Sequence, residues 1–503
     1  MGIHVVRRQL PPWLTPAAVA ALALGVRLYR LHWPGFWSDE GFALFLARLP
    51  LPELFSGTAN DLHPPLFYLL LKAWILPGWS VVYARLFPVL CGLLTVGIVY
   101  QIGRELFSPA AGGWAALYLA LAPTAIAYAR EVRMYALLLL LATLSFYLAY
   151  RWASSSGPGL WAGWIAAMLG ALYTQNLALL LLPVQNALVF WLLARQRRWR
   201  AFLPWLAGQL FVGIGYLPWF PIAFHQTVYH RPLWIERARP EQLGSLLPHL
   251  AFGEPWLSAA PENLWQWAAW IWVAAVVVLG GCLAAFRMPQ ARVPLIFAGL
   301  WFLLLLGTLF GLALRFPIYQ EKQFLMLLAP LALLAGAGTR ALPGASRGIA
   351  MAIFLLLIGP SLYNLYFVHR IADHPVEEQW QELAAYLEAE LQPGDGLVIQ
   401  PGAAATTLDL FLRARPDRIA YPSEYDPRVG NFYGEPATPE RVEALLRPFA
   451  ALHRRIWLIE CCVPTFWDPG RYIPAWLDAW GEPVSIPDFP GLEVHLYQAH
   501  EPR

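Results

Sequence analysis

Charge is what this sequence has least of. Asp, Glu, Lys and Arg make up only 13% of its 503 residues, and 58% are hydrophobic, whereas a typical soluble domain has about 25% charged residues. Lysine occurs only at Lys72 and Lys322, so arginine supplies almost all of the positive charge. The net charge of +3 is small and spread along the chain, which excludes the basic footprint of a nucleic-acid-binding protein. The composition predicts a protein of the lipid bilayer with no nucleic-acid partner.

Two other scarcities restrict the chemistry. Of the four cysteines, Cys91 and Cys282 stand in apolar runs and are interpreted as packing residues. Cys461 and Cys462 form an adjacent pair that is more typical of a buried strand than of a redox site. No cysteine spacing suits a metal site, and the C-terminal part of the chain has no nucleotide-binding glycine loop. The motifs therefore indicate no cysteine-based metal site and no nucleotide cofactor.

Charge-free apolar stretches recur along residues 1–373, and a helix needs about 20 apolar residues to cross a membrane. Such stretches lie near residues 9–26, 86–103, 106–129, 134–150, 201–224, 264–286, 293–314, 323–339 and 348–368. The stretch 152–194 is too long for one helix and predicts two, broken at the polar residues 173–176. The total is about eleven transmembrane helices, and this odd number places the two chain ends on opposite sides.

The charges around these stretches indicate the orientation. The run 9–26 ends in Arg27 and Arg30 without a small-residue cleavage site, so we interpret it as a first span and not as a secretion signal. An arginine cluster in residues 195–200 indicates that its side is cytoplasmic. Lys and Arg are about as numerous on the other side, but they are scattered through long loops. We expect those loops and the C-terminus to lie outside a cell (inner) membrane.

The first outer loop, residues 31–85, has structure of its own. Residues 41–55 alternate apolar and polar as in an amphipathic helix, and residues 63–76 form a second apolar stretch opened by Pro64 and Pro65. Both are too short to span a bilayer, so we predict helices that lie in the membrane interface.

The C-terminal part of the chain differs in composition. Residues 374–503 contain 20 of the 32 acidic residues, which predicts a boundary between a transmembrane domain, residues 1–373, and a soluble extracytoplasmic domain, residues 374–503. A helical period over residues 377–391 is followed by a short apolar strand pattern. A second helix and strand pattern follows at residues 439–459, and residues 494–497 resemble a closing strand. This alternation predicts a small α/β domain.

The first polar cluster that could carry chemistry is residues 37–41, Trp-Ser-Asp-Glu-Gly. Its adjacent carboxylates, Asp39 and Glu40, enter the first interfacial helix and could provide a general base for an alcohol nucleophile. The alternative is that Ser38 or Asp39 only caps the helix, because such side chains satisfy free backbone amides.

The second cluster, residues 61–68, places Asp61 and His63 before a double proline that starts a helix. A helix N-terminus attracts anions, so His63 could lie beside a phosphate. The alternative is a turn with a solvated histidine.

The third cluster, residues 128–135, is squeezed between two apolar runs. Arg130 and Arg133 are three residues apart and would share one face of a helix, where a pair of arginines suits bidentate recognition of phosphate. The alternative is that the arginines snorkel to the membrane surface. One cation would suffice for snorkelling, and Glu131 lies between Arg130 and Arg133, which favours a functional site. Lys322 adds a fourth outer cation.

Taken in order, these motifs resemble a known family. Residues 27–31, 36–40, 63–68 and 127–135, together with Arg85, are similar to motifs of the bacterial relatives of protein O-mannosyltransferases in the GT-C glycosyltransferase superfamily. The similarity is dense over residues 20–195 and thin afterwards. Where the family has an Arg-Tyr pair opening a late span, residues 321–325 read Glu-Lys-Gln-Phe-Leu.

The resemblance implies a GT-C fold and an enzyme that moves one sugar, with inversion, from a polyprenyl-phosphate donor to an acceptor hydroxyl outside the membrane. The acceptor would be a lipid, a glycan or a protein. Asp39 becomes the expected general base with Glu40 beside it. The expected substrate-binding residues are Asp61, His63, Arg130, Glu131, Arg133, Tyr135 and Lys322. A divalent cation, Mg or Mn, held by Asp39 stays open, because the sequence offers no closed set of metal ligands.

Two other classes of protein are alternatives to an enzyme. A transporter or lipid-linked sugar flippase would need polar or broken helices near the membrane midplane and usually an internal repeat, whereas the polar clusters here crowd one surface. A sensor would use the C-terminal domain as receptor and the helices as anchor. Eleven spans are more than an anchor requires.

Overall fold

A computed structural model describes residues 14–33, 35–228, 235–253, 279, 281–368, 370–371, 374–375, 378–430, 434–461 and 464–500. The chain divides into two compact units. The helical unit comprises Met1–Arg30, Arg85–Pro218 and Pro232–Leu365, and the mixed unit comprises Leu31–Ala84, Trp219–Arg231 and Tyr366–Arg503. Residues 31–84 thus group with the C-terminal segment. The predicted single boundary at residue 373 does not describe this grouping.

The described residues include six helices that are long and apolar enough to cross a membrane. These spans are α5 (Val81–Leu106), α8 (Tyr135–Ser155), Asn176–Arg195, α15 (Pro289–Ala313), Glu321–Ala341 and Gly344–Val368. The bent pair Trp199–Tyr216 and Phe220–Thr227 would add a seventh span. The chain is therefore a multi-pass membrane protein, as predicted. Most of the span predicted at residues 264–286 lies outside the described residues, and the total of eleven stays a prediction.

Several predicted spans are interrupted by proline or by polar residues. The stretch 106–129 is two helices, α6 (Pro109–Leu121) and α7 (Pro123–Tyr128), because Pro123 has no amide hydrogen to continue α6. The break predicted in residues 152–194 is confirmed. There, α9 (Pro158–Leu172) ends before a 3-10 turn at Asn176–Leu180 that leads into α10 (Leu181–Arg195).

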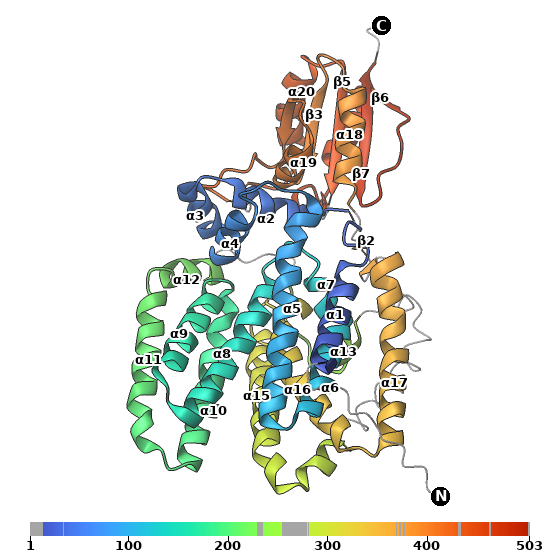
Figure 1. Cartoon of the computed structure of the whole chain (residues 1–503). Helices are drawn as coiled ribbons and strands as arrows, with labels where there is room; N and C mark the ends of the chain where they lie inside the picture. The colour runs from blue at the N-terminus through green and yellow to red at the C-terminus, as the bar shows by residue number, and fades with distance from the viewer. Residues whose placement is uncertain are drawn as a thin grey trace, which may run out of the picture. The chain divides into compact units, whose positions relative to one another are not determined.

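Further described helices belong to this unit (Figure 1). They are α1 (Leu14–Leu28), α11 (Phe202–Tyr216), α13 (Gln242–Phe252), a 3-10 helix at Glu321–Leu327 that leads into α16 (Leu328–Ala341), and α17 (Gly344–Tyr363), which ends in a π-helical turn at Asn364–Val368.

Small residues let helices α5, α6 and α16 approach closely. A Cβ atom at Gly112 would lie 2.5 Å from the Tyr100 carbonyl oxygen, and one at Gly336 would lie 2.6 Å from the Ala111 carbonyl oxygen. Contacts of this kind are typical of helix pairs in lipid, where packing replaces the hydrophobic effect.

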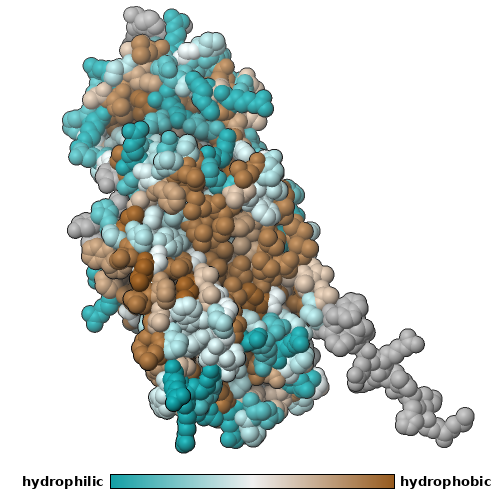
Figure 2. Space-filling model, turned by 60° about the vertical axis from the view of Figure 1, so that its left-hand side comes forward, coloured by the Kyte–Doolittle hydropathy of each residue, from teal (hydrophilic) through white to brown (hydrophobic). Residues whose placement is uncertain are grey.

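The outside of the helical unit is apolar. Leu203 on α11 is 76% exposed and Leu356 on α17 is 69% exposed, and both helices carry further exposed apolar side chains. Figure 2 shows one face of the molecule on which brown apolar side chains gather into a broad area. Such an area exceeds what soluble proteins expose and fits contact with lipid.

In the mixed unit, residues 31–85 form three helices: α2 (Ser38–Arg48), α3 (Leu51–Ala59) and α4 (Leu66–Trp74). The single helix predicted over residues 41–55 is wrong, because Pro50 cannot continue α2 and the chain restarts as α3. The helix predicted after the double proline is confirmed as α4. A further helix of this unit, α12 (Phe220–Val228), contacts α3.

The C-terminal segment contains a five-stranded sheet with the order β4-β3-β5-β7-β6. Strands β4 (Asp417–Ala420), β3 (Gly396–Gln400) and β5 (Arg455–Cys461) are parallel, and β7 (Leu492–Ala499) and β6 (Gly481–Val484) run antiparallel to their neighbours. Two short strands, β1 (Arg370–Ile371) and β2 (His374–Pro375), pair before the sheet begins.

Helices cover both faces of this sheet. Side chains of α18 (Trp380–Glu390) and α19 (Ala405–Phe411) share one core with Leu397 and Ile399, and those of α20 (Pro439–Ala450) and α22 (Tyr472–Trp480) share another with Val398. A short helix, α21 (Pro464–Trp467), precedes α22. The predicted helix and strand patterns are confirmed, while β4, β6 and the helices α19 and α22 were missed.

Candidate active site

The acidic pair occupies the first turn of α2. Glu40 is fully buried and Asp39 is half-buried. The N-cap residue is Trp37, which has no side-chain capping bond. The Ser38 amide instead donates to Glu378 Oε2 at 2.7 Å, and the Ser38 hydroxyl donates to Glu378 Oε1 at 3.2 Å. A distant carboxylate thus accepts a hydrogen bond from the first amide of this helix.

Asp61 and His63 also belong to the mixed unit, in the turn between α3 and α4. Asp61 is 6% exposed and His63 is 9% exposed, so the alternative of a solvated histidine is wrong. Close by, the ring of Tyr425 stands edge-on to Phe42, with 5.2 Å between ring centres. Burial, and secondarily the negative charge of Asp61, raises the pKa of the Tyr425 hydroxyl. The structure therefore collects the acidic pair, Asp61 and His63 in one compact unit.

The arginine pair lies in the helical unit, on the connection between α7 and α8. The prediction that Arg130 and Arg133 share a helix face is wrong, because α7 ends at Tyr128 and α8 begins only at Tyr135. Glu131, between them, is half-buried. The short connection still keeps both arginines inside the protein, with exposed fractions of 5% and 6% for the whole residues. This burial differs from snorkelling, in which the charged head reaches water.

Arg130 has a structural contact as well. Its Nη2 donates to the carbonyl oxygens of Tyr29 at 3.1 Å and Arg30 at 2.9 Å, just beyond the end of α1. Carbonyl groups at a helix C-terminus attract cations. Arg130 therefore helps to fix the end of α1.

Lys322 is brought to the same part of the helical unit. Its Nζ lies 5.5 Å from the centre of the Tyr135 ring, a cation–π distance. The preceding residue, Glu321, forms an ion pair with His249 at 2.7 Å. The 3-10 helix that contains both residues contacts α8 and α13. Arg130, Arg133 and Lys322 thus belong to the helical unit together with Glu131 and Tyr135. Asp39, Glu40, Asp61 and His63 belong to the mixed unit.

The fit of a divalent cation can be judged from the side chains near Asp39. Among the described residues, no group of three or more His, Cys, Asp or Glu side chains is placed to hold a metal ion. The described residues near Asp39 therefore do not form a closed set of metal ligands.

Glu378 is the residue that sequence reasoning missed. It is 7% exposed, and besides Ser38 it accepts a hydrogen bond from Trp380 Nε1 at 2.6 Å. Burial raises the pKa of this carboxyl to about 7, the hydrogen bonds oppose the rise and the charge of Asp39 adds to it. A contact between positions 340 residues apart leaves no periodic signal in the sequence.

Comparison with solved structures identifies the class of fold. The chain is similar to ArnT from Cupriavidus metallidurans bound to undecaprenyl phosphate, with a TM-score of 0.60 and 15% identity over 96% of this chain and 97% of that one. It is also similar to the oligosaccharyltransferase AglB from Archaeoglobus fulgidus, solved with an inhibitory peptide and a dolichol-phosphate. That match has a TM-score of 0.53 and 14% identity over 94% and 72% of the two chains. At these identities the likeness concerns the fold.

One segment of the sequence matches a family model. The family model described as dolichyl-phosphate-mannose-protein mannosyltransferase matches residues 62–221, a segment that includes His63, Arg130 and Arg133. Among curated proteins, no sequence matches this chain. The resemblance to GT-C glycosyltransferases related to protein O-mannosyltransferases is confirmed by the family model and the fold together.

Proposed function

We propose that this protein is an inverting glycosyltransferase that moves a single sugar, a hexose or a pentose, from a polyprenyl-phosphate donor to an acceptor hydroxyl. The observation that carries the proposal is buried charge of both signs in a GT-C fold. Glu40 is inaccessible, and Arg130 and Arg133 are almost so. Charge buried in a membrane protein is costly and marks function.

The chemistry follows from the residue types. The acceptor oxygen attacks the anomeric carbon while Asp39 takes the hydroxyl proton, and the bond between that carbon and the phosphate oxygen breaks. One displacement inverts the anomeric centre. The phosphate leaves on its own lipid, so no nucleotide is consumed.

The leaving phosphate gains negative charge as the bond breaks. Fixed cations aimed at developing charge are an effective means of stabilising a transition state. We assign this role to Arg133, Arg130, Lys322 and His63. Tyr135 would hold Lys322 through its ring, and Asp61 and Glu131 would orient these groups or bind sugar hydroxyls.

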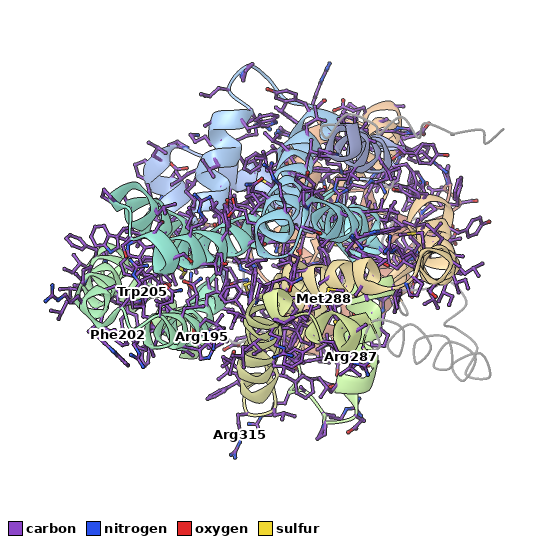
Figure 3. All side chains as sticks on the ribbon, turned by 60° about the horizontal axis from the view of Figure 1, so that its bottom comes forward. Arg195, Phe202, Trp205, Arg287, Met288 and Arg315 are labelled. Carbon is purple, nitrogen blue, oxygen red and sulfur yellow. The ribbon has the colours of Figure 1, made fainter. Side chains whose placement is uncertain are left out.

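The proposal includes a place for the enzyme. About eleven spans in the cell (inner) membrane would put the mixed unit, with its soluble C-terminal domain, outside the cytoplasm. The basic loop ends of the helical unit support this orientation, and Figure 3 shows two of their residues, Arg195 at the end of α10 and Arg287. The acceptor is a lipid, a glycan or a protein that reaches this outer face.

Sugar transfer by purified protein tests the proposal. The protein is incubated in detergent with synthetic undecaprenyl-phosphate hexoses and pentoses, each with a cell-envelope extract as the source of acceptor. Release of undecaprenyl phosphate is followed by mass spectrometry, with Asp39→Asn as the inactive control. A flippase would bind such donors without consuming them. If the unchanged protein consumes no donor in the panel, the proposal is wrong.

A further inference from the structure

The C-terminal segment forms hydrogen bonds with both backbone groups of Ser38, the first residue of α2. The Ser38 amide donates to Glu378 at 2.7 Å, and the Ser38 carbonyl oxygen accepts a hydrogen bond from the Thr407 hydroxyl on α19 at 3.2 Å. Ser38 directly precedes Asp39. Fixing the amide and the carbonyl of one residue restricts the backbone orientation of the next.

Close backbone approaches reinforce this attachment. A Cβ atom at Gly35 would lie 2.6 Å from the Glu378 carbonyl oxygen, and one at Gly41 would lie 2.1 Å from the Thr407 hydroxyl oxygen. The ring of Phe36, which is fully buried, stands edge-on to Phe411 with 6.1 Å between centres. Figure 1 shows α19 beside α2, and the two helices pack along their lengths. At Gly35 and Gly41 the acidic motif thus packs so closely on the C-terminal segment that a larger side chain would not fit.

Glu378 differs from an ordinary surface cap. It is 7% exposed, and its carboxylate oxygens accept from the Ser38 amide, the Ser38 hydroxyl and the Trp380 indole. Trp380 opens α18 and is fully buried in the core on one face of the sheet. The core of the sheet therefore fixes the position of the Glu378 carboxylate. The carboxylate in turn fixes the first turn of α2.

We propose that Glu378 is a positioning residue for sugar transfer: the C-terminal domain holds the first turn of α2 through Glu378 and Thr407 and so aims the Asp39 carboxylate. This inference rests on the proposed function, in which Asp39 is the general base. It gives the C-terminal domain a direct part in the reaction rate. A catalytic group misplaced by about 1 Å can lose about a hundredfold in rate.

The test combines local exchange with kinetics on the full-length protein in detergent. Glu378→Ala is expected to speed amide hydrogen exchange in peptides covering residues 36–44 by about tenfold, since one end of α2 opens. The turnover number for donor consumption should fall about 10- to 100-fold, while the affinity for undecaprenyl phosphate stays within about twofold. Glu378→Gln keeps the acceptor oxygen and should retain both the protection and the turnover.

A second variant approaches the same residue from α19. Thr407→Val keeps the side-chain shape but removes the donor to the Ser38 carbonyl, so it should reproduce a weaker form of the Glu378→Ala result. This variant also covers the case in which Glu378→Ala fails to fold.

Two controls separate positioning of Asp39 from other hydrogen bonds of the C-terminal segment. Ser56→Ala removes the hydrogen bond from the Ser56 hydroxyl on α3 to the Pro427 carbonyl oxygen, 3.0 Å, which attaches the C-terminal segment elsewhere. Glu388→Ala removes a carboxylate of α18 that accepts from the Ala414 amide at 2.9 Å. Both should leave exchange in α2 and turnover unchanged.

Three results would overturn the inference. Exchange in α2 could stay unchanged in Glu378→Ala, turnover could persist although exchange rises, or the control variants could lose turnover to the same extent. If the unchanged protein shows no transfer, the proposed function fails instead, and the exchange measurement still decides whether Glu378 holds α2.

Discussion

Lys322 and Tyr135 lie against each other across 187 residues of sequence, with the lysine Nζ 5.5 Å from the centre of the aromatic ring. Tyr135 is buried and opens α8, while Lys322 belongs to the 3-10 helix Glu321–Leu327. The family that the sequence resembles was expected to have an Arg-Tyr pair at this place. In this chain the cation and an aromatic ring come together from separate helices.

Lys322→Met should therefore weaken the binding of undecaprenyl phosphate. The loss is expected to be about 1.5–3 kcal/mol, the usual contribution of one hydrogen bond to a charged group. Tyr135→Phe keeps the ring and should bind normally, whereas Tyr135→Leu should behave like the lysine variant. The control is Lys72→Met, because Lys72, the other lysine of the chain, is held by the carbonyl oxygens of Ala47 and Leu49 in the mixed unit. Equal affinities in all four variants would remove Lys322 from the binding residues.

Arg133 is the second test of phosphate recognition. Arg133→Ala should weaken undecaprenyl phosphate binding by about 2–5 kcal/mol, as for one partner of a buried charged pair. Arg133→Lys should restore only part of this, because an ammonium cannot offer two parallel donors. Isothermal or fluorescence titration measures both.

Arg130 is a necessary comparison for this result. Arg130→Ala also removes the bonds to the Tyr29 and Arg30 carbonyl oxygens, so it should lower the melting temperature as well as the affinity. If Arg133→Ala lowers only the melting temperature, its burial is structural.

Orientation in the membrane is tested by labelling single cysteines in a background without the native four. A cysteine at Gly430 is not suitable for labelling, because a Cβ atom there would lie 2.2 Å from the Asn60 carbonyl oxygen. Leu452→Cys is suitable, since Leu452 is 78% exposed. An impermeant thiol reagent should label this cysteine in intact cells and should label Arg200→Cys only after the cells are opened. The reverse pattern would place the mixed unit in the cytoplasm.

How much of this fold the sequence could reveal depends on the range of the interactions. The break after residue 172, the helix after Pro64 and Pro65, and strand β5 follow from local composition, and all three are present. Strand β6 was missed because it is short and contains Glu482 and Pro483, which do not form an apolar strand pattern.

The same limit applies to the candidate site. Asp39 and Arg133 could be found because each stands in a polar cluster beside apolar runs. Glu378 could not, since it reaches Ser38 only through packing between distant segments. Lys322 was expected as a binding residue, but its contact with Tyr135 also joins distant segments and left no signal in the sequence. The helix face expected for Arg130 and Arg133 was wrong for a local reason: α7 begins at a proline and ends within six residues.

Glu378 also predicts a pH dependence of stability. Its pKa is raised from 4.5 to about 7, chiefly by burial, with Asp39 adding to the rise. Between these values the folded state holds a proton that the unfolded state has released. This contribution is therefore complete below pH 4.5 and is lost as the pH rises to about 7, an effect of at most about 3 kcal/mol.

Glu378→Gln imitates the protonated form at every pH. Melting temperatures should match those of the unchanged protein near pH 5 and exceed them near pH 8. Glu388→Gln is the control, because the pKa of Glu388 is lowered by the amides of Ala414 and Arg413. Parallel melting curves for the unchanged protein and Glu378→Gln across this range would contradict the assignment.

The decisive variant is Asp39→Asn, because it separates a general base from a helix residue. Asparagine can accept a hydrogen bond but has no carboxylate to take a proton at neutral pH. The first turn of α2 is capped by Glu378 and does not need the Asp39 charge, so folding and undecaprenyl phosphate binding should be nearly unchanged. Donor consumption should fall by a factor of about 10² to 10⁴, the usual loss for a positioned base.

Glu40 is adjacent and fully buried, so it could take the proton in part when Asp39 is replaced. Glu40→Gln and the double variant with Asp39→Asn therefore belong to the series, and rates are compared at saturating donor. The double variant should be the slowest, with donor affinity still normal. Near-normal turnover in Asp39→Asn and in the double variant would show that neither carboxylate is the base. The proton would then have to pass to Asp61, the remaining buried carboxylate of the outer loop motifs, and Asp61→Asn would become the inactive variant.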